Sequence, residues 1–348
     1  MTTSVEQAKN AAARWESEVA AAWPGFEGAF LHGSITWLAD DATLPATSDV
    51  DVIVVLAGDD RPPNPGKFLF DGVLLDASIL RANEVQSAEQ VLGISHLAGS
   101  LRGASILADP TGRLTAIQWQ VVRDFAKREW VIRRCEHAQG KILAFLDSLN
   151  PNRPLHDNVT SWLFGTGVTT HVLLVAGLRN PTVRSRYVAV HELLAEHDRL
   201  DIHEELLGLL GADNLTQLQV ERHFAAMTDA FDAAKSVIRT PFFFASDISE
   251  VARPIAIDGT REMIDRGYHR EAMFWIAATY ARCQKVLATD ASPELQDRFT
   301  PGFEDMLRDL SVVAYDDLVR RSAEVRAYMP RLRTIAEQIM DSNVAIEE

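Results

Sequence analysis

The chain has 348 residues, of which 47% are hydrophobic and 24% charged, and its formal net charge is −15. This composition is typical of a folded globular protein and excludes a disordered chain, and the length suggests about two domains. The acidic balance argues against a long nucleic acid as partner, because proteins that bind one generally carry a basic face.

Cysteine spacing and hydropathy bear on the compartment. Cys135 and Cys283 lie far apart and have neither CxxC spacing nor a framework of close pairs, which fits a reducing cytoplasm. The N-terminus lacks the order of a signal peptide, and we expect no run of about 18 apolar residues that could span a bilayer. The sequence therefore predicts a cytoplasmic protein with no membrane partner, and it indicates no particular oligomeric state.

The first third of the chain mixes strand and helix patterns. The segment 50–56 is β-branched and apolar on both faces, and Asp71-Gly72 is typical of a tight hairpin turn. In chain order, we predict a helix over 5–22, strands over 26–31 and 50–56, a loop over 62–66, hairpin strands over 67–70 and 73–80, a helix over 83–97 and a short strand over 104–107.

From Leu114 onward the apolar residues follow the period of helices. We predict either one long helix to about 150 or two helices with a kink between them, and an irregular segment over 240–254. Further helices are predicted near 157–178, 182–197, 201–210, 214–238, 259–288 and 317–340. The predicted fold class is α+β: a small mixed-sheet domain over residues 1–113, then an all-α helical bundle domain over 114–348.

Two aspartates stand at the start of the strongest predicted strand. Asp49 and Asp51 are two residues apart, so their side chains project to one face. Close carboxylates repel each other unless a cation lies between them, and hard oxygen ligands suit Mg²⁺. A third acid, Asp76, lies in the second strand of the predicted hairpin and could join them if the strands are neighbours. Asp71 competes for this role, but it has the better claim to the turn.

Gly33-Ser34 adds a candidate phosphate contact. Glycine lets the backbone approach a ligand closely, and Ser34 follows a predicted strand where the chain turns. Phosphate opposite a Mg²⁺ site indicates a nucleotide, and the chemistry expected is metal-assisted phosphoryl or nucleotidyl transfer.

The motifs "HGS", "SDVDVIVVL" and "LLDASIL" resemble the signature of the DNA polymerase beta-like nucleotidyltransferase superfamily, over about residues 26 to 112. With a helical domain after them, the chain is similar to the small-substrate branch that includes aminoglycoside nucleotidyltransferases. One departure is the 14 residues between Ser34 and Asp49, towards the long end of what we expect for the family.

The resemblance implies that Asp49 and Asp51 hold Mg²⁺, with two ions expected. It implies that Asp76 joins the metal or takes the acceptor's proton, and that Gly33 and Ser34 contact the triphosphate. The implied reaction moves a nucleoside monophosphate, with ATP the expected donor, onto a hydroxyl of a small acceptor bound by the helical domain, with an aminoglycoside-like molecule as a candidate. Two other hypotheses are nucleotidylation of a protein or RNA end, and a catalytically silent nucleotide sensor.

Basic residues that could hold the triphosphate are harder to rank. Arg102 and Arg186 are the leading candidates, ahead of Lys67 and Arg184, although a solvated surface charge is the commoner role for each. Histidines 191, 197 and 203 lack the spacing of a zinc helix and are expected at the surface or at helix caps. A further set of residues could contact the acceptor, although core packing and solvated charge are the commoner roles for such residues. The set is Trp162, Trp275, Tyr280, the run 242–244, Asp157, Asp247 and Glu250.

Overall fold

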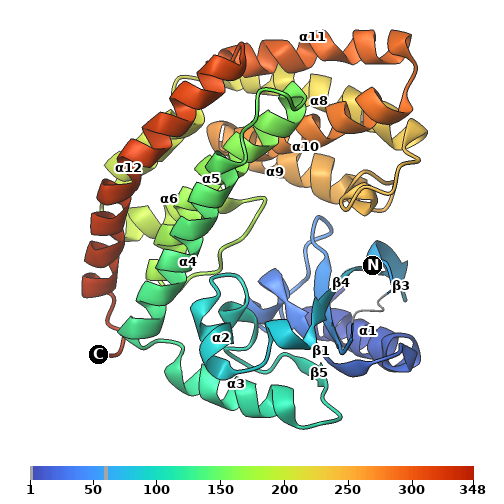
Figure 1. Ribbon diagram of the computed structural model, residues 1–348, viewed down its shortest axis with the longest axis vertical. Helices are drawn as coiled ribbons and strands as arrows, with labels where there is room; N and C mark the ends of the chain where they lie inside the picture. Colours follow the sequence, from blue (N-terminus) through green and yellow to red (C-terminus); the bar gives the residue numbers. More distant parts are fainter. Residues whose placement is uncertain (1–2, 59–61) are drawn as a thin grey trace. The chain divides into compact units, whose positions relative to one another are not determined.

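The computed structural model describes residues 3–58 and 62–348, which form two compact units (Figure 1). The first unit runs to Arg134 and includes Val251–Ile255 and Val344–Glu348. The second comprises Cys135–Glu250 and Ala256–Asn343. The predicted α+β class is confirmed, because a mixed sheet lies in the first unit and helices follow.

The first unit is built on a five-stranded sheet with the order β3-β4-β2-β1-β5. Its strands are β1 (Phe26–His32), β2 (Val50–Leu56), β3 (Gly66–Phe70), β4 (Val73–Arg81) and β5 (Ile106–Ala108). The central strand β2 pairs parallel with β4 and antiparallel with β1. The hairpin of β3 and β4 turns at Asp71-Gly72, where φ is 49° and 77°, so the predicted turn is confirmed.

Helices cover both faces of this sheet. On one face, α1 (Val5–Glu18) packs its alanines and Trp15 against the even-numbered valines of β2. A Ser4 and Gln7 capping box starts α1. On the other face, α2 (Ala88–Gly93) and α3 (Arg113–Asp124) pack against Phe30, Ile53 and Val55. This two-sided burial explains why β2 is apolar on both faces.

The boundary between the two units lies later in the chain than the predicted 113/114, because α3 packs with the first unit. Leu114, Ile117 and Val121 of α3 are buried with the sheet residues, so this helix belongs to the first unit. Of the two predicted alternatives, the structure has two helices: α3 ends at Asp124, and α4 (Arg128–Asp147) begins after three intervening residues. The C-terminal segment binds the backbone at this break: the Arg128 N–H donates to the Glu347 carbonyl at 2.7 Å.

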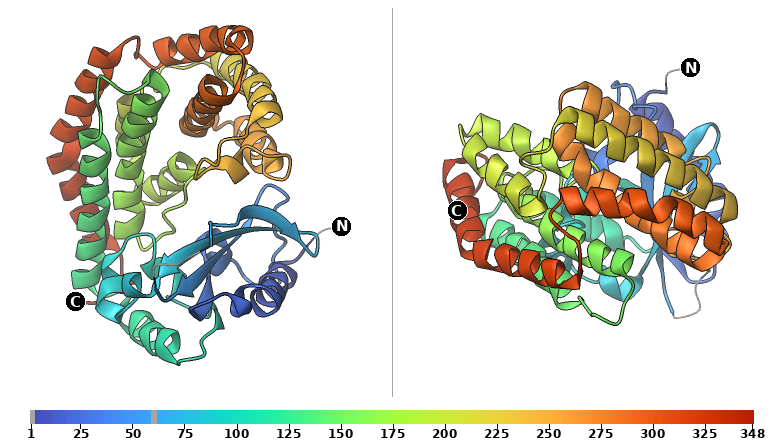
Figure 2. Two further views of the ribbon diagram at one scale, coloured as in Figure 1. Left: turned by 45° about the vertical axis from the view of Figure 1, so that its right-hand side comes forward. Right: turned by 90° about the horizontal axis from the view of Figure 1, so that it is seen from above.

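The second unit is helical. Besides most of α4, it contains α5 (Leu155–Ala176), α6 (Arg186–Glu196), α7 (Leu200–Leu210), α8 (Gln217–Val237), α9 (Gly259–Asp265), α10 (His269–Asp290), α11 (Pro293–Asp309) and α12 (Tyr315–Ser342). Helix α5 packs beside α12, and α8 beside α10 (Figure 2).

The largest differences from the predicted helices concern two predicted helices and one helix that was not predicted. The helix predicted over 83–97 is only α2, because Ser87 caps it and the chain leaves the helical conformation at Ile94. The helix predicted over 259–288 is two, divided at Gly267, whose φ is 90°. Helix α11 was not predicted, because Pro301 and Gly302 interrupt its pattern although the helix contains both.

Helix α5 differs from the expectation that no segment is apolar enough to cross a membrane. Its length and mean hydropathy of 1.4 pass that test, but 83% of its apolar window is buried inside the structure. Gly165 and Gly167 explain part of this burial, since a Cβ on Gly167 would lie 2.5 Å from the Phe274 ring. These glycines therefore allow close helix packing.

Candidate functional site

A row of polar side chains crosses four neighbouring strands at one level of the sheet. The registers align His32 of β1 with Asp51 of β2, Asp51 with Asp76 of β4, and Asp76 with Lys67 of β3. Because side chains alternate along a strand, this row shares the face of Ile53 and Val55. The sheet thus brings together residues that are up to 44 positions apart, from His32 to Asp76.

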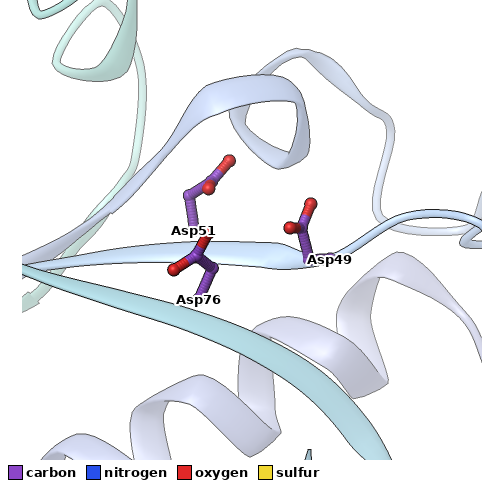
Figure 3. A group of neighbouring side chains, drawn as sticks. All are labelled: Asp49, Asp51 and Asp76. Carbon is purple, nitrogen blue, oxygen red and sulfur yellow. The ribbon is translucent and has the colours of Figure 1, made fainter. Parts of the chain in front are cut away.

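The three predicted carboxylates meet in this row. Asp49 directly precedes β2, and one oxygen of each of Asp49, Asp51 and Asp76 lies within 4.8 Å of the other two. Asp49 and Asp51 project from the same side of their segment, with Asp76 on the adjacent strand (Figure 3). All three are partly exposed, so a ligand from solvent can reach them.

This donor set fits a divalent cation. Three carboxylates supply the hard oxygen ligands that Mg²⁺ prefers, and a positive charge among them relieves their mutual repulsion. The structure supplies such charge from within the chain. The Lys67 ammonium lies 2.9 Å from Asp49 Oδ2 and also donates to Asp76 Oδ2. A cation is therefore already held where the acids converge.

Gly33 can lie next to this row because it has no side chain. Its φ is 66°, and a Cβ built on it would lie 2.1 Å from Asp51 Oδ2. Gly33 begins the 3₁₀ turn η2 (Gly33–Trp37), which the Thr36 hydroxyl closes by donating to the Gly33 carbonyl at 2.9 Å. The glycine therefore lets the turn, including the partly exposed Ser34, approach the Asp51 carboxylate closely.

Arg102 lies beside the same turn. Its guanidinium carbon is 3.6 Å from the centre of the Trp37 ring, and its Nε is buried with no hydrogen-bond partner among the residues that the structure describes. Burial lowers the pKa of Arg102 from its ordinary value. Stacking on Trp37 orients the guanidinium beside the turn.

Two features of the row were not singled out from the sequence. Lys67 was ranked below Arg102, although it is the residue that touches the acids. His32 was given no role, yet it aligns with Asp51 and its Nδ1 lies 2.6 Å from Ser100 Oγ. Strand pairing was the missing information, since Lys67 begins a predicted strand and His32 directly follows the strand predicted over 26–31.

The competing acid Asp71 lies in the hairpin turn. It has a left-handed backbone, and the Arg14 Nε donates to its carboxylate at 2.8 Å. Asp76, and not Asp71, is therefore the acid that the sheet places beside Asp49 and Asp51.

Arg186 differs from the expectation for a nucleotide contact. It belongs to the second unit, is 1% exposed and lies with its guanidinium carbon 4.0 Å from the Phe274 ring centre. Burial lowers its pKa to about 9. Its side chain is enclosed by the helical core because Gly167 leaves room for it, so neither a surface charge nor an exposed phosphate contact describes it.

The expectation of surface or capping histidines holds for one of the three. His197 caps the end of α6, but His203 is 1% exposed and its ring lies 4.8 Å from that of His191. Their neighbours Glu271 and Tyr268 complete a polar cluster inside the second unit. Apolar residues between the histidines pack into the core, and this packing buries the side of α6 and α7 that carries His191 and His203.

The remaining predicted acceptor contacts have partners within the second unit. Trp162 and Tyr280 are core residues, while Phe243 is 90% exposed and its neighbour Phe244 is buried. The three acids form ion pairs: Asp157 with Lys285, Asp247 with Arg282 and Glu250 with Lys235. The commoner roles, core packing and charge pairing, thus describe most of this set.

Comparison with protein-family models, with curated proteins and with solved structures found no match to this chain. The residues of the row and their geometry are therefore the observations that bear on function.

Proposed function

We propose that this protein is a Mg²⁺-dependent nucleotidyltransferase that moves a nucleoside monophosphate from a nucleoside triphosphate to a hydroxyl of a small acceptor. The observation that carries the proposal is the convergence of Asp49, Asp51 and Asp76 beside the Gly33-Ser34 turn. Taken alone, the three carboxylates or the Gly33-Ser34 turn could each have a purely structural role. Together they provide a metal site and an adjacent approach for phosphate, as the resemblance implies.

The roles of the residues follow from their positions. Asp49 and Asp51 would hold the metal, and Gly33 with Ser34 would contact the triphosphate on the same side of β2. Arg102, oriented by Trp37, offers a donor near that turn. Mg²⁺, when bound, would supply charge neutralisation to the attacking and leaving oxygens, and we expect two ions.

The reaction that these residues would support is an in-line displacement. The acceptor's hydroxyl oxygen bonds to the α-phosphorus, the bond from that phosphorus to the β-phosphate oxygen breaks, and pyrophosphate leaves. The hydroxyl proton needs an acceptor, and a carboxylate of the row, with Asp76 the candidate, would take it or join the metal. ATP is the expected donor and an aminoglycoside-like molecule a candidate acceptor, with the helical domain the proposed acceptor-binding part.

The test is pyrophosphate release from each of the four common nucleoside triphosphates with Mg²⁺, with and without a panel of aminoglycosides and related hydroxylated amines. The proposal predicts release that depends on an acceptor and is lost in the Asp49→Asn/Asp51→Asn double variant. Asp71→Asn is the matched control, since this acid lies in the turn. Triphosphate binding without release, even with cell extract as the acceptor source, would indicate a silent nucleotide sensor. A mass shift on an extract protein or an RNA end would indicate a macromolecular acceptor.

A further inference from the structure

Lys67 occupies an unusual position for a residue next to a metal site. It lies on β3 opposite Asp76, and its ammonium contacts Asp49 Oδ2 at 2.9 Å as well as Asp76 Oδ2. Its side chain is only 10% exposed, compared with 21% for Asp49 and 22% for Asp76. One partly shielded ammonium therefore contacts both Asp49 and Asp76 where the carboxylates of the row converge.

This arrangement and a bound metal exclude each other on electrostatic grounds. The oxygens of Asp49, Asp51 and Asp76 lie within 4.8 Å of one another, so a divalent cation among them would lie next to the Lys67 ammonium. Two cations at such a separation repel strongly where water is partly excluded. Asp49 and Asp76 cannot keep their ion pairs with the Lys67 ammonium and at the same time bind the metal with their full negative charge.

The lysine side chain is suited to leave. It is a point charge on a flexible four-carbon stem, so it can change rotamer without moving the strand that carries it. An arginine fork on the same carboxylates would bind them bidentately and would be harder to displace. The residue type therefore fits a temporary counter-ion.

We propose that Lys67 is an exchangeable counter-ion: it neutralises Asp49 and Asp76 in the metal-free protein, the divalent cation displaces it, and the released ammonium binds a phosphate oxygen of the nucleoside triphosphate. The last step rests on the proposed function, whereas the exchange rests on the ion pairs alone. Lys67 thereby couples metal entry to triphosphate binding, because the metal must be in place before the ammonium is available.

The first test is the affinity for Mn²⁺ alone, measured by electron paramagnetic resonance of free Mn²⁺. Removing the competing charge in Lys67→Met should tighten Mn²⁺ binding by about tenfold or more. Lys9→Met is the matched control, because Lys9 also pairs with a carboxylate of the first unit, Asp40, at 2.8 Å, and it should leave the affinity unchanged. Lys67→Arg should weaken binding.

The outcomes separate this proposal from the proposed function. Equal Mn²⁺ affinity in the wild type and Lys67→Met would contradict the exchange and leave the metal site intact. Absence of Mn²⁺ binding in both would contradict the metal site itself. With saturating Mn²⁺, Lys67→Met should bind ATP more weakly than the wild type; tighter metal binding without this loss would contradict the phosphate contact alone.

A second test uses the wild-type protein and so does not depend on whether a variant folds. The folded chain is briefly treated with an amine-acylating reagent, with and without Mg²⁺, and acylation at each lysine is measured by peptide mass spectrometry. Exchange predicts that Mg²⁺ increases acylation of Lys67 several-fold and leaves Lys9 unchanged. Unchanged acylation of Lys67 at Mg²⁺ concentrations that saturate the site would contradict the exchange.

Discussion

The two units place their cations in opposite settings. In the first unit, Lys67 lies against two carboxylates in a partly exposed row. In the second unit, Arg186 is buried on Phe274, and its Nη1 has no hydrogen-bond partner. An ion pair open to solvent can exchange one cation for another, whereas an enclosed guanidinium can leave only if the core opens. The contrast between Lys67 and Arg186 therefore predicts ligand binding at the sheet and a structural packing role for Arg186.

The largest expected effect tests the structural role of Arg186. Arg186→Ala should lower the free energy of unfolding by about 3 kcal/mol, because it leaves a cavity in a packed core. Arg186→Met keeps most of the volume and removes the unpaired donor, so its cost should stay below about 1.5 kcal/mol. Urea unfolding measures both. If either folded variant bound ATP more weakly than the wild type, the contrast between the two cations would fail.

The second effect concerns His203, whose pKa is lowered to about 4, chiefly by burial and then by His191. The unfolded chain takes up a proton near pH 6.5 and the folded chain does not, so this group costs stability as pH falls from 6.5 towards 4. From pH 7 to pH 5 the loss should be about 2 kcal/mol.

Urea unfolding at both pH values should show that loss in the wild type and a smaller one in His203→Gln. Nearby Glu271 acts in the opposite direction, because burial raises its pKa and its contribution is lost as pH rises. An equal pH dependence in the wild type and His203→Gln would show that the histidine is not held neutral by the fold.

The third effect tests how closely the Gly33 turn approaches Asp51. Gly33→Ala places a Cβ 2.1 Å from the carboxylate at a φ of 66°, so it should cost about 1–2 kcal/mol of stability. It should also weaken Mn²⁺ binding by moving Asp51. Gly93→Ala is the control, since nothing lies within 4 Å of its Cβ position. Equal Mn²⁺ affinity in Gly33→Ala and Gly93→Ala would show that Gly33 does not contribute to the metal site.

The smallest effect is expected at Asp71, the acid that the sequence left in competition with Asp76. Its ion pair with Arg14 is about half exposed, so Asp71→Asn should change stability by less than about 0.5 kcal/mol. Asparagine also tolerates the left-handed backbone of this turn. Mn²⁺ affinity should be unchanged, and a tenfold loss would show that the wrong acid has been placed in the row.

Local patterns explain which parts of the fold could be predicted. The strands β1 and β2, the Asp71-Gly72 turn and the acidic pair all follow from short apolar runs, neighbouring residue types and turn chemistry. Strand order does not, because the parallel pairing of β2 with β4 joins segments that are distant in the chain. Lys67 and His32 were undervalued for this reason. Similarly, nothing near Arg186 in the sequence shows that Phe274 and Gly167 enclose it.

The most direct test of the account is triphosphate binding, which needs no knowledge of the acceptor. An ATP analogue with a methylene group between the α and β phosphorus atoms cannot release pyrophosphate, and its affinity is measured by calorimetry. The account predicts that binding requires Mg²⁺ and weakens at least about tenfold in Asp51→Asn, but not in Asp71→Asn. Equal binding in the presence of EDTA, equal binding in Asp51→Asn, or no binding at all would contradict it.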